Sequence, residues 1–110
     1  MAKRVLLLAS GSGSLAQALF DGNFAGRCEF VGLISDKQSP VLERARKAGV
    51  RDIYLPMTED RSAWNAEILS ISQSLDPDLV ISVGFMRILA PDYVNRFKVC
   101  LLYTSDAADE

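Results

Sequence analysis

Small residues near the start of the chain have the types and spacing that bind an anion. The apolar run Val5–Leu8 is followed by the sequence SGSGS at residues 10–14, and a helical pattern begins at Ser14. Gly11 and Gly13 allow a close approach to a ligand that side chains would prevent. The first turn of this helix offers unpaired backbone N–H groups and the positive end of its dipole. The segment therefore predicts a phosphate-binding turn between a buried strand and a helix.

The same turn also fits two other interpretations. The spacing of Gly11, Gly13 and Ala16 matches the dinucleotide-binding fingerprint, and Asp36 stands about 20 residues further on, where that fingerprint has its ribose-binding acid. Alternatively, the glycines only make a tight connection between a strand and a helix. A P-loop is excluded because no Gly-Lys-Ser/Thr sequence follows. A Rossmann-type nucleotide-binding module thus stays open as a hypothesis.

Large apolar side chains and one arginine gather in a second segment, GFMRILAP at residues 84–91. Apolar residues in a loop either pack into the core of their own domain or contact a flat apolar ligand. Both interpretations stay open for Phe85, Ile88 and Leu89. At the start of an earlier predicted helix, Arg61 is by default a surface charge and Trp64 a core residue.

The overall composition restricts the classes of function. The chain has 110 residues, of which 49% are hydrophobic and 24% charged, as expected for one folded globular domain. Its net charge of −2 provides no attraction for nucleic acid or an anionic membrane surface. No apolar run approaches the roughly 20 residues that span a bilayer. We therefore expect a cytoplasmic protein that acts on a small molecule and binds neither nucleic acid nor membrane.

The chain contains no histidine, which excludes imidazole as a general acid or base in this sequence. Its two cysteines, Cys28 and Cys100, have the spacing of no metal or redox motif. A mechanism that depends on imidazole, or on a cysteine-ligated metal, therefore cannot be assigned to these residues.

The elements that must position the two segments alternate strictly between strand and helix. Buried apolar runs predict strands at residues 5–9, 29–35, 52–55 and 79–83, and helical patterns begin near residues 14, 40, 60 and 91. This alternation is typical of an α/β fold with a parallel sheet of about four strands, in the order 3-2-1-4, and helices on both faces. The order places a topological switch point between the first and fourth strands, where segments 10–14 and 84–89 meet.

The paired sequences ASGSGSLAQ at residues 9–17 and GFMRIL at residues 84–89 resemble the phosphoribosylglycinamide formyltransferase family, the folate-dependent enzymes of purine synthesis. The sequences ERARKAGV at residues 43–50 and RSAW at residues 61–64 are similar to the same family. The similarity covers residues 1–98 and implies the Rossmann-like N-terminal half of such an enzyme. Two related folate-dependent enzymes, methionyl-tRNA formyltransferase and formyltetrahydrofolate deformylase, stay open as alternatives, as does the nucleotide-binding module.

The resemblance implies a substrate and a set of residues that bind its phosphate. Gly13, Ser14 and Leu15 match the loop that holds the phosphate of glycinamide ribonucleotide. Many family members have Asn where this chain has Leu15, so Leu15 is expected to contribute only its backbone. The implied reaction is attack of the glycinamide amine on a formyl carbon, through a tetrahedral intermediate whose oxyanion must be stabilised.

The resemblance also implies 10-formyltetrahydrofolate as the formyl donor. The second segment matches the loop whose backbone hydrogen-bonds the edge of the pteridine ring, and Arg61 matches a basic position near the folate. The folate-binding residues expected on this basis are Arg61, Met86, Arg87, Ile88 and Leu89.

The sequence departs from the family after Val99. The family's catalytic group is an Asn, a His within an Asn-x-His-Pro strand and a later Asp, and that strand should follow Val99 directly. Instead the chain continues CLLYTSDAADE over residues 100–110, which resembles translated read-through of a sequencing adapter. We therefore expect residues 1–98 to form the formyltransferase region, truncated and inactive, and residues 99–110 to be a foreign tail. Truncation would leave the fourth strand at an exposed edge and the fold only marginally stable.

Overall fold

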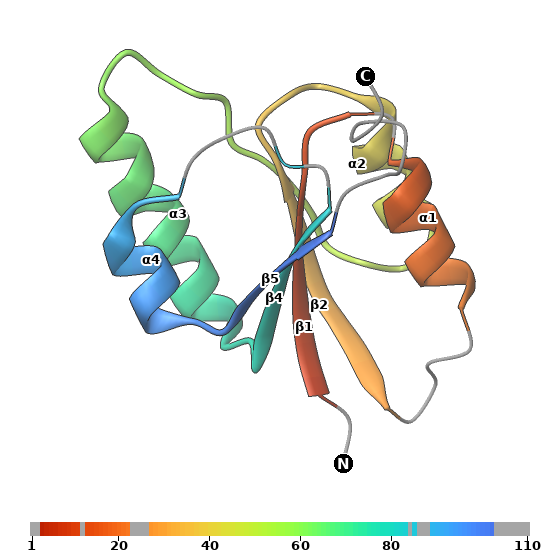
Figure 1. Cartoon of the computed structure of the whole chain (residues 1–110). Coiled ribbons are helices and arrows are strands. Elements are labelled where there is room, and N and C mark those ends of the chain that lie inside the picture. Colours follow the sequence, from red (N-terminus) through yellow and green to blue (C-terminus); the bar gives the residue numbers. More distant parts are fainter. Residues whose placement is uncertain (1–2, 12, 23–26, 84, 86–88, 103–110) are drawn as a thin grey trace.

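The computed structural model describes residues 3–11, 13–22, 27–83, 85 and 89–102, which form an α/β fold (Figure 1). The strands are β1 (Lys3–Ala9), β2 (Cys28–Ser35), β3 (Asp52–Tyr54), β4 (Leu79–Val83) and β5 (Val99–Leu102). The helices are α1 (Ser14–Asp21), α2 (Pro40–Lys47), α3 (Arg61–Leu75) and α4 (Pro91–Arg96). Strand and helix alternate along the described chain until the end, as predicted.

In the described part of the chain, five parallel strands form one sheet in the order β3-β2-β1-β4-β5. The predicted order 3-2-1-4 is confirmed. The expectation that the fourth strand forms an exposed edge is wrong, because β5 pairs with β4 from Val80↔Val99 to Val83↔Leu102. The first residues of the segment expected to be foreign thus continue the sheet, and residues 103–110 lie outside the described residues.

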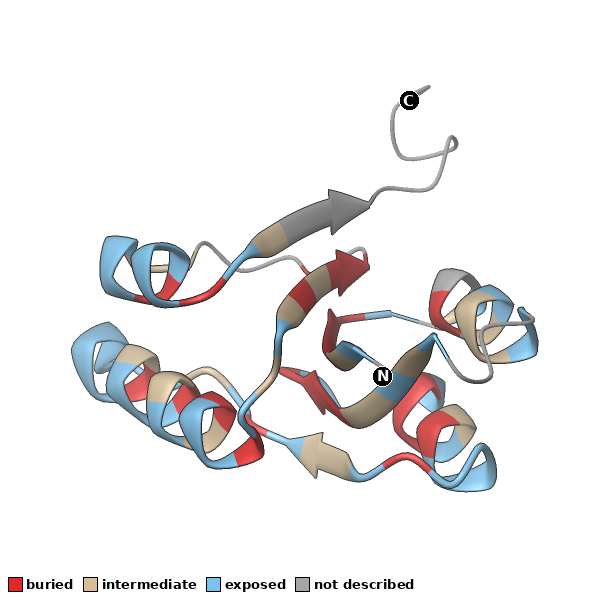
Figure 2. Ribbon diagram, turned by 90° about the horizontal axis from the view of Figure 1, so that it is seen from below, coloured by how far each residue is buried: buried red, intermediate tan, exposed pale blue. Residues whose placement is uncertain are grey.

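The sheet has a hydrophobic core on each face, because apolar side chains alternate in direction along its central strand. On β1, Leu6 and Leu8 pack toward α3 and α4, whereas Val5 and Leu7 pack toward α1 and α2. Figure 1 shows these two pairs of helices on opposite sides of the sheet, and Figure 2 shows buried residues along the inner faces of the helices. This three-layer arrangement leaves the ends of the strands as the place for a site.

Two helices differ in detail from the sequence-based expectation. On α1, the sequence pattern predicts one apolar side formed by Leu15, Ala18 and Leu19, but Ala18 is exposed and Leu19 is half-buried, whereas Ala16 is fully buried. At the start of α2, the sequence Ser39-Pro40 predicts a capping serine followed by a proline at the first helical position. Ser39 occupies the N-cap position but makes no capping hydrogen bond, and its hydroxyl donates to the carbonyl of Lys37 at 3.3 Å. On α3, Trp64 is buried as predicted.

Arg4 fixes the C-terminal end of α3 to the sheet. Its guanidinium donates to the carbonyl oxygens of Leu75, at 2.7 Å, and Asp76, at 3.0 Å, where a helix leaves carbonyl groups without a partner. Its backbone N–H donates to the Asp78 carboxylate at 2.9 Å. The amino edge of the sheet and the end of α3 are therefore held together, so α3 has a defined direction toward the opposite edge.

A buried hydrogen bond between Ser72 and Tyr93 joins α3 to α4, with 2.8 Å between the two hydroxyl oxygens. Burial raises the pKa of Tyr93 to about 12, against about 10 in an unfolded chain. Between these values the unfolded chain loses the phenol proton while the folded chain retains it. Stability contributed by this group is therefore complete below about pH 10 and is lost as the pH rises to about 12, by at most about 1.4 kcal/mol per pH unit.

We expect urea unfolding between about pH 9 and pH 11.5 to show this alkaline loss of stability. The matched variant Tyr93→Phe should cost about 1 kcal/mol at neutral pH through the lost hydrogen bond. It should also remove most of the alkaline slope, because the buried phenol is gone. A slope that is the same in both proteins would assign the alkaline transition to other groups.

Candidate functional site at the carboxyl edge of the sheet

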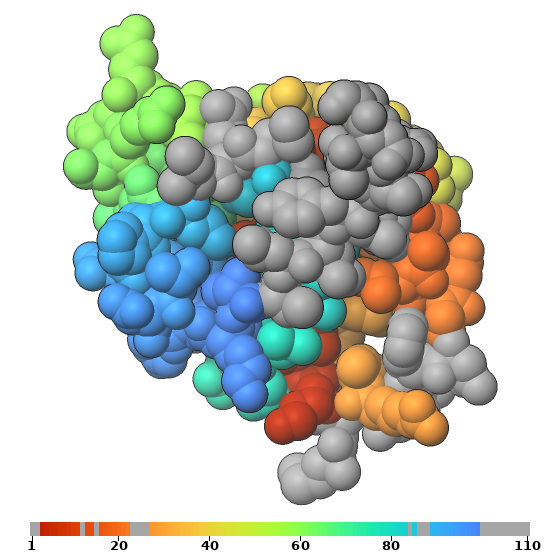
Figure 3. Space-filling model, in the orientation of Figure 1, coloured from red at the N-terminus to blue at the C-terminus, as the bar shows by residue number. Residues whose placement is uncertain are grey.

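The candidate site lies where β1 and β4 end side by side. Ala9, the last residue of β1, pairs with Val83, the last residue of β4. The glycine-rich turn at residues 10–14 and the segment that follows β4 therefore leave the sheet at neighbouring points. This juxtaposition confirms the predicted strand neighbours at the switch point, where ligands of open parallel sheets bind. In the space-filling view α3 and α4 lie against each other on one side, and α1 lies on the other (Figure 3).

The surroundings of Gly11 and Gly13 in the turn differ, so the structure explains each glycine in a different way. Gly13 has a φ of +85°, and a Cβ atom there would lie 2.5 Å from Val41 Cγ2 and 2.9 Å from Val41 Cα. Gly13 is therefore required for the contact between the turn and α2. A Cβ atom on Gly11 would have no heavy atom of the described residues within 4 Å. Gly11 is exposed, so no side chain among the described residues covers the end of β1 at this position.

The N-terminus of α1 completes the turn. Gly13 is its N-cap and has no side chain to accept a hydrogen bond, and its carbonyl receives the N–H of Gln17 at 2.7 Å. Ser14 is the first helical residue and is exposed, whereas Leu15 follows in the helix with only its backbone described. The first turn contains no acidic residue to offset the positive end of the dipole. An anion at this helix end stays the prediction from the sequence.

The Asp36 side chain is buried and forms a hydrogen bond within the protein. Asp36 is 4% exposed and Ser10 is 2% exposed, and the Asp36 carboxylate accepts a hydrogen bond from the Ser10 hydroxyl at 2.6 Å. A ribose-binding acid needs a carboxylate directed at the ligand, so this arrangement speaks against the dinucleotide interpretation. Sequence reasoning missed Ser10 as the partner. The signal was that each residue directly follows one of two neighbouring parallel strands, β1 and β2.

The second segment divides between core and site. Phe85 is buried and stacks on Trp64, with ring centroids 6.2 Å apart and an interplanar angle of 17°. Leu89 is half-buried and packs against the same core. The core interpretation therefore holds for Phe85, and Leu89 retains some exposed surface. The predicted folate-binding residues Met86, Arg87 and Ile88 lie outside the described residues.

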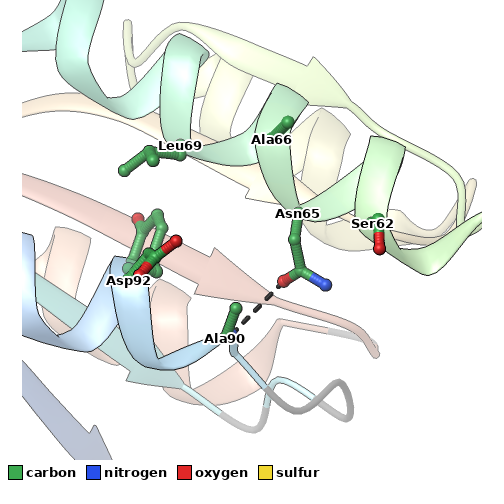
Figure 4. A pocket seen from close by; sticks show the side chains of 7 residues that line it. Ser62, Asn65, Ala66, Leu69, Ala90 and Asp92 are labelled. Atoms are coloured by element: carbon green, nitrogen blue, oxygen red, sulfur yellow. Dashed lines mark hydrogen bonds between the residues drawn. The ribbon is translucent and has the colours of Figure 1, made fainter.

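Arg61 is exposed at the first position of α3, which begins at the carboxyl edge of the sheet (Figure 1). One turn later, the Asn65 side chain donates to the Arg61 carbonyl at 2.8 Å and accepts the Ala90 N–H at 3.3 Å (Figure 4). Asn65 had not been singled out from the sequence, because an isolated asparagine in a helix carries no motif. Beside it lies a groove of about 290 Å³ between α3 and α4, lined by Ser62, Asn65, Ala66, Leu69, Ala90, Asp92 and Tyr93.

The chain matches the formyl transferase family over residues 3–104. It belongs to this family. Its sequence is 37% identical to the phosphoribosylglycinamide formyltransferase of Mycobacterium tuberculosis over 109 residues, which cover 94% of this chain and 50% of that protein. It is 32% identical to the phosphoribosylglycinamide formyltransferase of Escherichia coli over 103 residues, which cover 89% of this chain and 49% of that protein.

The fold of this formyl transferase chain is also similar to solved structures. The glycinamide ribonucleotide transformylase 1 of Symbiobacterium toebii superimposes with a TM-score of 0.82 at 32% identity, covering 93% of this chain and 50% of that one. The chain thus spans about half the length of the relatives it matches. Among the described residues of the formyl transferase chain, no group of acidic, cysteine or histidine side chains could hold a metal ion, and no helix is long and apolar enough to cross a membrane.

Proposed function

We propose that this chain is part of an enzyme that transfers a formyl group from 10-formyltetrahydrofolate to the amine of glycinamide ribonucleotide in de novo purine biosynthesis. The observation that carries the proposal is that, among the described residues, Gly11 is exposed beside the N-terminus of α1, at the point where β1 and β4 end together. Membership of the formyl transferase family supports formyl chemistry. The names of the relatives support glycinamide ribonucleotide as the acceptor.

The proposed phosphate subsite consists of Gly13, Ser14 and Leu15. The backbone N–H groups of the first turn of α1 supply the hydrogen bonds, because those groups have no partner within the helix. The exposed Ser14 hydroxyl is a further donor to the phosphate. The Leu15 side chain has no polar atom, so this position acts through its N–H group alone.

The proposed formyl-donor subsite consists of Arg61, Met86, Arg87, Ile88 and Leu89. Two of them are described by the structure and have suitable chemistry. The half-buried Leu89 offers apolar surface to a flat ring, and the exposed Arg61 offers a cation to the carboxylates of the donor's glutamate. When bound, 10-formyltetrahydrofolate supplies the formyl carbon.

In the proposed reaction the glycinamide amine forms a new bond to the formyl carbon, and the bond from that carbon to the folate nitrogen breaks. The amine loses one proton and the folate nitrogen gains one, which gives N-formylglycinamide ribonucleotide and tetrahydrofolate. The oxyanion of the intermediate needs hydrogen-bond donors held in place. From the resemblance to the family, an Asn-x-His sequence is expected immediately after Val99, where this chain has Cys-Leu-Leu.

We therefore propose that this chain binds both substrates without catalysing transfer, and that the tail after Val99 is foreign to the natural protein, although β5 pairs with β4 and the family match extends to residue 104. Sequencing the source gene onward from the Lys98 codon tests the second proposal. An in-frame Asn-x-His-Pro sequence followed by a later Asp would support it. A reading that repeats the present residues to a genuine stop codon would overturn it.

Calorimetric titration with glycinamide ribonucleotide and, separately, with NAD distinguishes formyl transfer from dinucleotide binding. We expect glycinamide ribonucleotide to bind at one site and inorganic phosphate to compete with it, because the phosphate is the group that the turn recognises. We expect NAD to bind at least about tenfold more weakly, since the Asp36 carboxylate is bonded to Ser10. The opposite order of affinities would favour the nucleotide-binding module.

A further inference from the structure

Two consecutive residues of α3 contact the two described ends of the segment that follows β4. The Trp64 ring stacks on Phe85, near the start of this segment. The Asn65 amide oxygen accepts the N–H of Ala90, at its end. Because Arg61 lies one helical turn before Asn65, the same part of α3 also carries the exposed cation of the proposed formyl-donor subsite.

The Trp64 side chain also has a hydrogen-bond partner outside the segment that follows β4. It is 1% exposed, and its indole N–H donates to the carbonyl of Leu55 at 3.2 Å, in the connection between β3 and α3. Phe85 therefore stacks on an aromatic ring that is buried and hydrogen-bonded to the chain before α3. The start of the segment belongs to the core, and its position is set by packing.

The end of the segment is fixed by hydrogen bonds. The Ala90 carbonyl accepts the N–H of Tyr93 at 2.9 Å and that of Val94 at 3.2 Å, which begins α4. Its N–H donates to the Asn65 side chain, so the polar backbone groups of Ala90 are both bonded. The next residue, Pro91, has no N–H group that could take over this contact. Among the described residues, the Asn65 amide is thus the direct hydrogen bond from α3 to this junction.

Asn65 also uses its other amide group. Its nitrogen donates to the Arg61 carbonyl at 2.8 Å, which orients the side chain along the helix and directs the oxygen at Ala90 (Figure 4). The residue is half-buried at the side of the groove between α3 and α4. This amide therefore connects the helical turn that carries Arg61 to the junction that follows Leu89.

We propose that Asn65 is a positioning residue for the formyl donor. It sets the distance between Arg61 on α3 and Leu89, the two described residues of the proposed donor subsite, and so determines the affinity for the donor; this inference rests on the proposed function. The phosphate turn at residues 10–14 connects β1 to α1, and α1 lies on the other side of the sheet from α3 (Figure 1). Loss of the Asn65 contact should therefore weaken donor binding and leave acceptor binding unchanged.

The test compares three variants of the whole chain by calorimetric titration with 10-formyltetrahydrofolate and with glycinamide ribonucleotide. Asn65→Leu removes both amide groups at similar volume. Asn65→Asp retains an oxygen that can accept the Ala90 N–H. Gln73→Leu, at an exposed position of the same helix, is the matched control for a polar-to-apolar change. Emission from Trp64, the single tryptophan of the chain, checks that the core around α3 is intact in each variant.

We expect Asn65→Leu to raise the Kd for 10-formyltetrahydrofolate about tenfold, and its Kd for glycinamide ribonucleotide to change less than about twofold. Asn65→Asp should restore donor affinity to within about threefold of the unmodified chain, and Gln73→Leu should match it. Unchanged donor affinity in Asn65→Leu, or equal weakening of both ligands, would overturn the inference while the proposed function stands. If the unmodified folded chain binds no donor, the proposed function and this inference fail together.

Discussion

Replacing Gly13 with alanine is expected to lower the free energy of unfolding by about 2–4 kcal/mol. The backbone at Gly13 has a φ of +85°, a conformation that a residue with a Cβ atom adopts only with strain. The new methyl group would also lie 2.9 Å from the Cα atom of the fully buried Val41, so α2 would have to shift. Urea unfolding followed by circular dichroism measures this loss.

The matched control is Gly11→Ala, two residues earlier in the same turn. A Cβ atom there meets no heavy atom of the described residues within 4 Å, so we expect the stability to change by less than about 1 kcal/mol. The same methyl group should weaken glycinamide ribonucleotide binding, because it occupies space proposed for the phosphate. Equal loss of stability in the two variants would contradict the conclusion that only Gly13 is required for packing against α2.

Replacing Trp64 with alanine is expected to cost about 3–5 kcal/mol, a large part of the stability of a small domain. The indole is 1% exposed, is packed in the core between the sheet and α3, stacks on Phe85, and hydrogen-bonds the Leu55 carbonyl. Its removal leaves a cavity and an unpaired carbonyl, and it releases the segment after β4 from the core. Thermal and urea unfolding should both show the loss.

Trp64→Phe separates the packing of the ring from the hydrogen bond. Phenylalanine keeps an aromatic surface against Phe85 and loses the N–H donor to Leu55, so we expect a loss of about 1–2 kcal/mol. The alanine variant should be destabilised clearly more than this. Similar stabilities for the two variants would show that the stack contributes little to holding the segment.

The strand order and the layers could be predicted because they depend on local patterns. An uninterrupted apolar run such as Val5–Leu8 predicts a strand buried on both faces, and strict alternation with helices leaves few topologies. The helical spacing of Trp64, Ile68, Ile71 and Leu75 predicts the buried face of α3; three of these residues are buried, whereas Ile71 is partly buried and packs against the same core. β5 was not predicted. Because the sequence departs from the family at Cys100, residues 99–102 were interpreted as a foreign tail, whereas they pair with β4.

The site was predicted only in part, since its details depend on contacts between distant residues. The sequence spacing predicted the same role for Gly11 and Gly13, close approach to a ligand. In the structure, only at Gly13 would a Cβ atom collide with Val41. Asp36 matched a ribose-binding acid by position, but its carboxylate is bonded to Ser10. Asn65 has no motif, and its importance follows from a hydrogen bond to a residue 25 positions away.

The central claim is that this chain binds both substrates of formyl transfer but lacks the groups that catalyse it. The most direct test is one calorimetric titration of glycinamide ribonucleotide into the chain saturated with 10-formyltetrahydrofolate. We predict a heat of binding at each injection that saturates at one site and returns to the baseline, with no tetrahydrofolate formed. Absence of any binding heat from the folded chain would contradict the claim that it binds, and a sustained heat of reaction would contradict the claim that it cannot catalyse.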